Sequence, residues 1–195
     1  MRLVLTGILI AVTFLGGCLF EPRVAALPGG ADINYLEQSE PEFVLANLQS
    51  AFQHTDASGY ERQIAEDFVY EPDSSTEANY PGLDWETWNR EMEIQSITNF
   101  FNNVAGISAD LTAEELHTDW SGSFAELRYV YAIEVESGGS TVPYRATATL
   151  EFILDGTFWK LSRWYDENGE NDPESGGLLP TIGQRRGAFL AAGGS

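Results

Sequence analysis

The sequence contains very little cysteine, histidine and lysine, and few positive charges of any kind. One cysteine, two histidines and a single lysine, Lys160, occur in 195 residues. One cysteine excludes a disulfide within the chain, and two histidines leave little for a histidine-based zinc site. Lysine and arginine number 10 against 30 aspartates and glutamates, for a net charge of −20. We therefore expect no nucleic-acid partner, because such binding depends on basic side chains that neutralise phosphates.

The length and the apolar content of the chain fit one packed domain with tails. Domains hold about 100–200 residues each, so 195 residues do not allow two full ones. Hydrophobic residues make up 43% of the chain and aromatic residues 12%, which is enough to build a core.

The N-terminus carries an apolar run, Leu3 to Leu15, directly after Arg2. A basic start, a run of about 7–15 apolar residues and small residues beyond it describe a secretory signal. Spanning a bilayer takes roughly 20 apolar residues, so the run is too short for that. The residues Leu15-Gly16-Gly17-Cys18 resemble the bacterial lipobox, after which the cysteine is lipidated. The alternative is an ordinary signal peptide followed by an incidental cysteine.

The lipobox resemblance implies a localisation and an anchor. Residues 1–17 would be removed, and Cys18 would carry the lipid that binds the protein to a membrane. Leu19 is not aspartate, which in Gram-negative lipoproteins favours export to the outer membrane over retention. Several acyl chains, at about 0.8 kcal/mol per buried CH₂, give stable anchoring. We expect a bacterial cell-envelope protein on the outer membrane, facing the periplasm.

The mature chain divides by composition into three parts. Residues 18–38 contain prolines and glycines without an apolar period and are typical of a tether. Residues 39–166 carry the periodic patterns of a folded domain. Residues 167–195 are first acidic and then rich in glycine and alanine, and we expect a tail there, some of whose apolar residues could dock locally.

Three helices are expected in the first half of the chain. Ser39 and Glu42 have the spacing of a capping box, and the apolar residues that follow repeat at helical spacing. A second helix after Asp56 would place Asp67 and Glu71 near its end, and Asp84 would cap a third. The apolar residues of these helices are Val44, Leu45, Leu48, Ala51 and Phe52; Tyr60, Ile64 and Phe68; and Trp85, Trp88, Met92, Ile94, Ile97, Phe100 and Phe101.

The second half alternates between apolar and polar residues and predicts antiparallel strands over 124–136, 141–154 and 157–165. Ser137-Gly138-Gly139-Ser140 joins the first two strands, so that residue 136 pairs with 141. Asp155-Gly156 suits a two-residue turn, so that 154 pairs with 157. This register places Arg163 opposite Ala148 on the inner face, and it leaves Glu126 facing Glu151 on the outer face.

Helices followed by a curved meander define an α+β domain. The stretches Leu48–Glu71 and Thr149–Asp166 resemble the NTF2-like, or SnoaL-like, cone fold. The resemblance covers most of residues 40–166. It implies helices packed on the concave face of a curved antiparallel sheet.

The predicted register gathers polar side chains inside the cone. Tyr129, Tyr131 and Tyr144 point inward, beside the space left by Ala146 and Ala148. A cavity lined in this way is typical of a small-ligand site. Arg163 and Tyr165 join them from the last strand, and Arg163 requires a carboxylate, for which Glu71 and Asp67 are candidates. A structural clasp, a ligand pocket and a catalytic site all remain open for this group.

The resemblance also bears on catalysis. Glu71-Pro72 resembles the base position of ketosteroid isomerases, but their oxyanion tyrosine would fall near Leu48, which donates no hydrogen bond. His54 and His117 do not match the histidines of scytalone dehydratases, and His54 is expected to be either the C-terminal cap of the first helix or a surface group. Residues 166–172 fail the EF-hand pattern because glycine comes fourth, so no metal or cofactor is expected.

These observations favour a module that binds a small apolar or anionic ligand or a protein partner. The alternatives are a small isomerase or hydrolase with Glu71 as general base, and a scaffolding lipoprotein. A homodimer through the outer sheet face is a further expectation.

Overall fold

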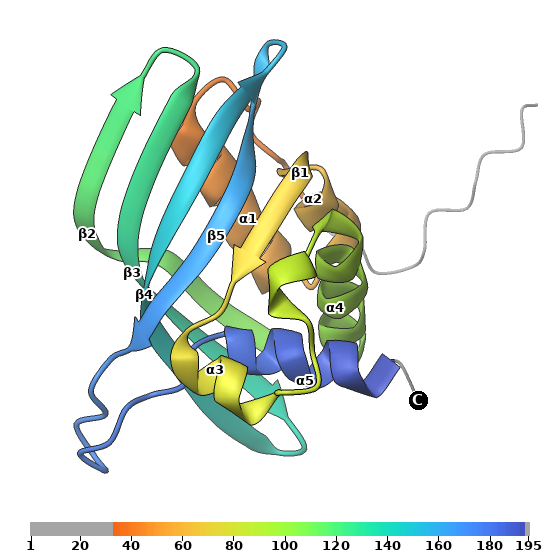
Figure 1. Ribbon diagram of the computed structural model, residues 1–195, viewed down its shortest axis with the longest axis vertical. Coiled ribbons are helices and arrows are strands. Elements are labelled where there is room, and N and C mark those ends of the chain that lie inside the picture. The colour runs from red at the N-terminus through yellow and green to blue at the C-terminus, as the bar shows by residue number, and fades with distance from the viewer. Residues whose placement is uncertain (1–32, 194–195) are drawn as a thin grey trace, which may run out of the picture. The chain divides into compact units, whose positions relative to one another are not determined.

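The computed structural model describes residues 33–193, so the expected signal segment and Cys18 lie outside the described residues. This part of the chain contains five helices, one short 3₁₀ turn and five strands. Figure 1 labels the helices and strands. Along the chain they are α1 (Pro41–Gln53), α2 (Ala57–Glu61), β1 (Ile64–Glu71), α3 (Ser74–Asn79), η1 (Trp85–Thr87), α4 (Arg90–Asn102), β2 (Gly106–Ser121), β3 (Phe124–Ser137), β4 (Ser140–Asp155), β5 (Phe158–Gly169) and α5 (Gly183–Gly193).

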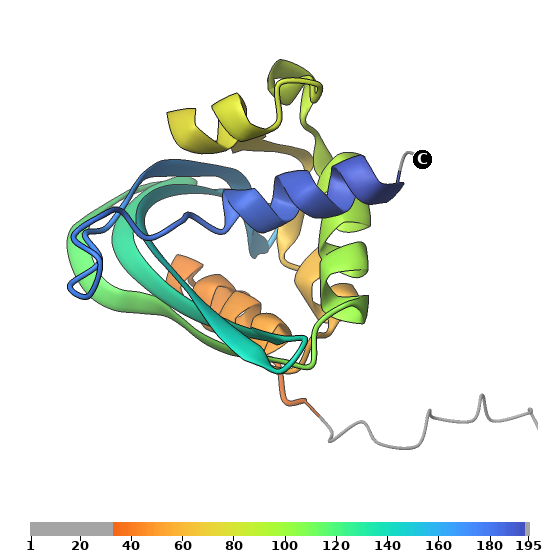
Figure 2. The ribbon, with the colours of Figure 1, turned by 90° about the horizontal axis from the view of Figure 1, so that it is seen from below.

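The strands form one curved mixed sheet in the order β1-β5-β4-β3-β2. All neighbours are antiparallel except β1 and β5, which run parallel. Figure 2 shows α1 inside the curve of the sheet and α5 crossing its open side beside α4. The core lies between these layers and confirms the predicted α+β cone.

Helix α1 forms where its apolar period predicts, and Val44, Leu48 and Phe52 are fully buried. The predicted capping box is wrong, because the N-cap is Glu40 and its side chain makes no capping hydrogen bond. His54 is the C-cap as expected, and its Nδ1 lies 2.8 Å from the carbonyl oxygen of Ser50.

The second predicted helix is only partly correct. Helix α2 ends at Glu61, and Ile64 begins strand β1. The spacing of Tyr60, Ile64 and Phe68 is four residues, which suits one face of a helix but is also an even number, as one face of a strand requires. Pairing with β5 decides in favour of the strand.

The third predicted helix begins later than expected. Trp85 lies in the short turn η1 and Trp88 just beyond it, and α4 starts only at Arg90. Asn89 is the cap, because its side chain accepts hydrogen bonds from the backbone N–H groups of Glu91 and Met92.

The predicted register of β3 and β4 is confirmed throughout. Glu136 pairs with Thr141, Tyr131 with Ala146, and Leu127 with Leu150. Gly138 and Gly139 form the turn with φ of 60° and 82°, a conformation that residues with a side chain rarely adopt.

The predicted register of β4 and β5 is wrong. Near the turn it is displaced by two residues, because Gly156 and Thr157 form the turn and Asp155 pairs with Phe158. The ladder then shifts between Phe152, which pairs with Leu161, and Glu151, which pairs with Arg163. Ser162 is therefore an extra residue in a β-bulge, and beyond it the inward and outward positions of β5 exchange.

The folded part of the chain does not end at Asp166. Strand β5 continues to Gly169, and α5 packs on α4 and α3 instead of forming a tail. Strand β2 was also not predicted, because most of its second half is exposed and shows no alternation. No helix among residues 33–193 is long and apolar enough to cross a membrane.

Candidate functional site

The bulge at Ser162 moves two predicted pocket residues to the outside of the cone. Arg163 and Tyr165 lie on the outer face, where the side chain of Arg163 is 42% exposed. Trp164 and Asp166 take their places inside and are buried. Sequence reasoning placed the wrong pair inside because it assumed an unbroken alternation along β5.

The predicted partners of Arg163 are also on the outside. Asp67 and Glu71 lie on β1 and not on a helix, and Asp67 is exposed. Arg163 Nε lies 3.1 Å from Glu71 Oε1, and its Nη1 donates to Glu151 Oε1 at 3.2 Å. Arg163 thus links β1, β5 and β4, and it offsets the repulsion between Glu126 and Glu151. Ion pairs as exposed as these contribute at most about 1 kcal/mol.

Three predicted pocket residues do point inward. Tyr129, Tyr131 and Tyr144 are at most 6% exposed. Tyr131 makes the most contacts: its hydroxyl donates to Asp166 Oδ1 at 3.1 Å and accepts from the backbone N–H of Ile182 at 2.9 Å. Tyr131 thereby ties the sheet to the segment that leads into α5.

Asp166 is the centre of a buried cluster that the sequence analysis did not find. Its carboxylate accepts hydrogen bonds from Tyr70 at 2.7 Å, from Trp164 Nε1 at 2.8 Å and from Tyr131. Burial raises the pKa of Asp166 above its ordinary value, although Arg186 and the three donors act in the opposite direction. Burial likewise raises the pKa of the Tyr70 and Tyr131 hydroxyls.

A second buried carboxylate, Glu93 on α4, pairs with Arg186 on α5. Arg186 Nε donates to both oxygens of Glu93 at 3.0 and 3.2 Å, and both side chains have no exposed surface. Tyr60 and Trp88 Nε1 also donate to Glu93, at 2.5 and 3.0 Å.

The guanidinium of Arg186 is enclosed by aromatic rings. It lies 4.3 Å from the ring centroid of Tyr70 and 4.4 Å from that of Trp164. These rings belong to the Asp166 cluster, so the two clusters form one buried polar network.

This network fills the side of the cone where a cavity was predicted. Arg186 on α5 and Ile182, which directly precedes this helix, are both fully buried, and the backbone carbonyl of Arg186 accepts from Ser96 at 2.9 Å. Ala146 and Ala148 belong to the same packed core. Among the pockets on the surface of the described residues are three that border α3, η1 or α5, and none of these is lined by Tyr129, Tyr131 or Tyr144.

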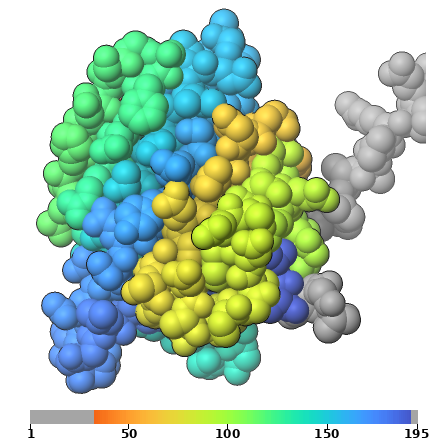
Figure 3. All heavy atoms as spheres, viewed as in Figure 1, coloured from red at the N-terminus to blue at the C-terminus, as the bar shows by residue number. Residues whose placement is uncertain are grey.

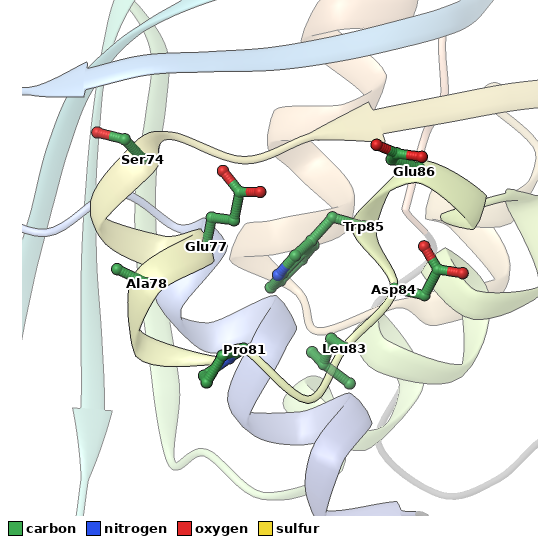
Figure 4. Close-up of a pocket in the computed structure, with 8 residues that line it drawn as sticks. All are labelled: Ser74, Glu77, Ala78, Pro81, Leu83, Asp84, Trp85 and Glu86. Atoms are coloured by element: carbon green, nitrogen blue, oxygen red, sulfur yellow. The ribbon is translucent and has the colours of Figure 1, made fainter.

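Two of these pockets adjoin on the outside of the domain, near α3 and η1. Their volumes are about 430 and 390 Å³, and both are lined by Glu77, Trp85 and Glu86 (Figure 4). We call them together the outer trough. Glu71 lines the second pocket, so this predicted residue borders a surface hollow, although not the cone.

Metal binding finds no support in the described residues. No group of three or more histidine, cysteine, aspartate or glutamate side chains among them is arranged to hold an ion. In the acidic loop after β5, Asp172 accepts from the backbone N–H of Glu174 and from Ser175, as in an ordinary turn.

Comparison with known proteins identifies the fold and leaves the activity open. No protein-family model and no curated protein sequence matches the chain. A scytalone dehydratase-like protein from Novosphingobium aromaticivorans is similar in structure, with a TM-score of 0.56, 11% identity and coverage of 73% of this chain and 90% of that one.

Two further structures agree. An NTF2-like protein of unknown function from Pseudomonas putida has a TM-score of 0.53 at 14% identity, with coverage of 73% of this chain and 92% of that one. A protein of unknown function from Mycobacterium tuberculosis has a TM-score of 0.55 at 12% identity, with coverage of 77% and 84%. The described part of the chain is an α+β cone, and its fold is that of the NTF2-like proteins.

Proposed function

We propose that this chain is a lipid-anchored protein of the bacterial cell envelope whose NTF2-like domain is a binding module. One observation carries the proposal: α5 and the Arg186–Glu93 pair occupy the interior, where relatives with this fold would need room for a substrate. We therefore place the binding site on the outer surface of the domain, since functions are added to folds at particular sites.

The anchor is supported by the lipobox-like residues that end at Cys18. The test is to express the full chain in a Gram-negative host that is fed an alkyne analogue of palmitate. Wild type should take up the label and sediment with outer membranes, whereas Cys18→Ala should do neither. The anchor is refuted if the label persists in Cys18→Ala or if wild type is recovered as a soluble protein.

A protein partner is supported by an apolar surface at the ends of two hairpins, which we call the tip patch. Trp120, Phe124, Leu154 and Phe158 are each 38–45% exposed there. The hairpins adjoin, because the N–H of Leu154 donates to the carbonyl of Ser123 at 2.9 Å and the rings of Trp120 and Trp159 lie 5.4 Å apart. Figure 3 shows these strand ends side by side along the upper edge. Clustered exposed apolar residues are typical of interaction sites.

Site-specific photo-crosslinking in cells tests the tip patch. A benzophenone amino acid in place of Phe158 should give a discrete adduct, and the same group in place of exposed Ser175 should not. An adduct of twice the chain mass would assign the patch to self-association instead of to another protein. No adduct at either position, or equal adducts at both, would overturn the proposal.

The other expectations are less well supported. Glu71 is paired with Arg163 and shares its pocket with no tyrosine, whereas an isomerase would need a group that stabilises developing negative charge. An anionic ligand would find no support from Arg163, because this side chain lies on the outer face and is paired with Glu71 and Glu151. A homodimer through the outer sheet face would bury the ion pairs of Arg163 and of Arg128 with Glu167. Burying such pairs brings a desolvation cost.

A further inference from the structure

The outer trough has a different composition from the tip patch and from the filled cone. Its walls come from the end of β1, from α3 and from the segment that runs through Pro81 to η1 (Figure 4). Each of the two adjoining pockets is within the range of about 300–1,000 Å³ that is usual for small-molecule sites. Ala78, Pro81 and Leu83 supply apolar surface.

The charged groups of the trough are all acidic. Glu71, Glu77, Asp84 and Glu86 line it, and no lysine, arginine or histidine does. Arg163 compensates Glu71 from outside the lining. Among the described residues, the carboxylates of Glu77, Asp84 and Glu86 make no hydrogen bond or ion pair. Three uncompensated carboxylates around one hollow produce a negative potential that attracts cations.

Trp85 supplies an observation that is independent of charge. Its side chain is only 7% exposed, and its indole Nε1 is buried without a hydrogen-bond partner in the described residues. The ring is held in place by stacking on Trp88, with centroids 5.0 Å apart and planes at 10°. In Figure 4 the nitrogen lies on the side of the ring nearer Glu77 and Ala78, toward the hollow. A buried donor without a partner is costly, so a ligand that brings an acceptor is favoured.

The cation that fits is organic and not a metal ion. No three acidic side chains in the described residues converge in the way that an ion requires. Apolar walls beside separated carboxylates suit a carbon skeleton that ends in an ammonium or guanidinium group.

We propose that the outer trough binds an organic cation, with its ammonium or guanidinium group attracted by the negative potential of Glu77, Asp84 and Glu86 and an acceptor oxygen on the indole N–H of Trp85. A free amine with a nearby oxygen and a lysine or arginine side chain beside its own backbone carbonyl share this chemistry. The site is separate from the tip patch and does not depend on it.

The test uses calorimetric titration of residues 33–195, which form one compact unit with its own core. The probes are N-acetyl-lysine methylamide, the uncharged N-acetyl-norleucine methylamide, and putrescine, an amine without an acceptor. The lysine derivative should bind saturably and the norleucine derivative should not. Raising NaCl from about 20 to 200 mM should weaken the binding, because solvent-accessible charges are screened.

Variants separate the two parts of the site. The double variant Glu77→Gln/Glu86→Gln should weaken binding of the lysine derivative about tenfold. The matched pair Glu66→Gln/Glu174→Gln, on exposed acids outside the trough, should leave it unchanged. Trp85→Phe keeps a stacked ring and removes the donor, so it should weaken the lysine derivative but not putrescine. Tighter binding of the lysine derivative than of putrescine would favour a polypeptide source for the cation.

Three results would overturn the proposal. The first is no saturable heat from the lysine derivative up to about 10 mM, far weaker than the usual affinity of a ligand site. The second is equal binding of the norleucine derivative. The third is unchanged binding in Glu77→Gln/Glu86→Gln while thermal unfolding of that variant is normal.

Discussion

Arg186 and Glu93 form an ion pair in which neither side chain has any exposed surface, although 93 residues separate them along the chain. Arg186 lies on α5, the last described helix, and Glu93 lies on α4. The pair closes the open side of the cone, where Figure 2 shows the two helices crossing. The last helix is thus a structural part of the domain.

Removing the charge of Arg186 while Glu93 remains should strongly destabilise the domain. Arg186→Met would leave Glu93 buried without its counter-charge, which costs about 3–5 kcal/mol. Urea unfolding measures the loss. The matched control is Arg185→Met, because Arg185 is half-buried and lies 5.4 Å from the ring centroid of Tyr144. This control should cost no more than about 1 kcal/mol. Equal losses in both variants would mean that the pair has no special role.

A methyl group at the start of α5 should also disturb the packing of this helix over the open side of the cone. A Cβ at Gly183 would lie 2.1 Å from the hydroxyl of Tyr70, which donates to Asp166. Gly183→Ala should therefore destabilise the domain by about 1–3 kcal/mol, as overpacking does. Gly177→Ala is the control, because its nearest neighbour would be at 3.5 Å. Thermal unfolding compares them, and an unchanged midpoint for Gly183→Ala would contradict the packing described.

Asp166 should make stability decrease as pH rises. Its pKa is raised in the folded protein, so the folded state holds the proton more tightly than the unfolded chain, whose value is near 3.8. The stabilisation is complete below that value and is lost as pH rises through the raised pKa. Urea unfolding between about pH 4 and 8 should show this loss in wild type.

The stability of the variant Asp166→Asn should change less with pH over the same range. Its carbonyl oxygen still accepts from Tyr131 and Trp164, and its amide can donate to the hydroxyl of Tyr70. Glu167 has the opposite dependence, because its hydrogen bond with Arg128 lowers its pKa. Wild type and Asp166→Asn both contain Glu167, so its contribution cancels when their pH profiles are compared. Identical pH dependence in wild type and Asp166→Asn would refute the assignment.

The bulge on β5 should be removable without changing which residues face inward. Deleting Ser162 would join the two registers of β5, with Leu161 and Trp164 still inward and Arg163 still outward, so we expect cooperative unfolding to remain. Ser162→Ala keeps the bulge and loses only the hydrogen bond to the carbonyl of Glu151, 3.1 Å long. It should cost about 0.5–1.5 kcal/mol. Near-UV circular dichroism and urea unfolding compare both variants with wild type, and loss of cooperative unfolding in the deletion variant would contradict the register.

The sequence predicted the fold and one hairpin, and it failed where β5 departs from alternation. Strands β3 and β4 alternate without interruption between a glycine turn and their far ends, so their register followed directly. The predicted register left Glu126 opposite Glu151. This repulsion indicated an irregularity in β5, because Arg163 reaches Glu151 only where the ladder is displaced by the bulge. Trp164 is also the more apolar of the two residues that compete for the inner face.

The sequence also contains a pattern from which the buried ion pair could have been predicted. Glu93 has Ile97, Phe100 and Phe101 at helical spacing, and Arg186 lies between Ile182 and the pair Phe189 and Leu190 in the same way. Opposite charges on two apolar helix stripes predict a buried pair. Which helices meet could not be predicted, because their contact depends on the path of the whole sheet.

The parallel pairing of β1 with β5 has a consequence for how the chain folds. Tyr70 on β1 donates to Asp166 on β5 across 96 residues, and the α5 contacts span a similar distance. Such long loops must close before the core gains their stabilisation, so folding of this topology is slow. A chain that emerges N-terminus first from a ribosome lacks its closing helix until residues 183–193 have been made. The buried pair of Arg186 and Glu93 therefore forms only after all five strands of the sheet are available.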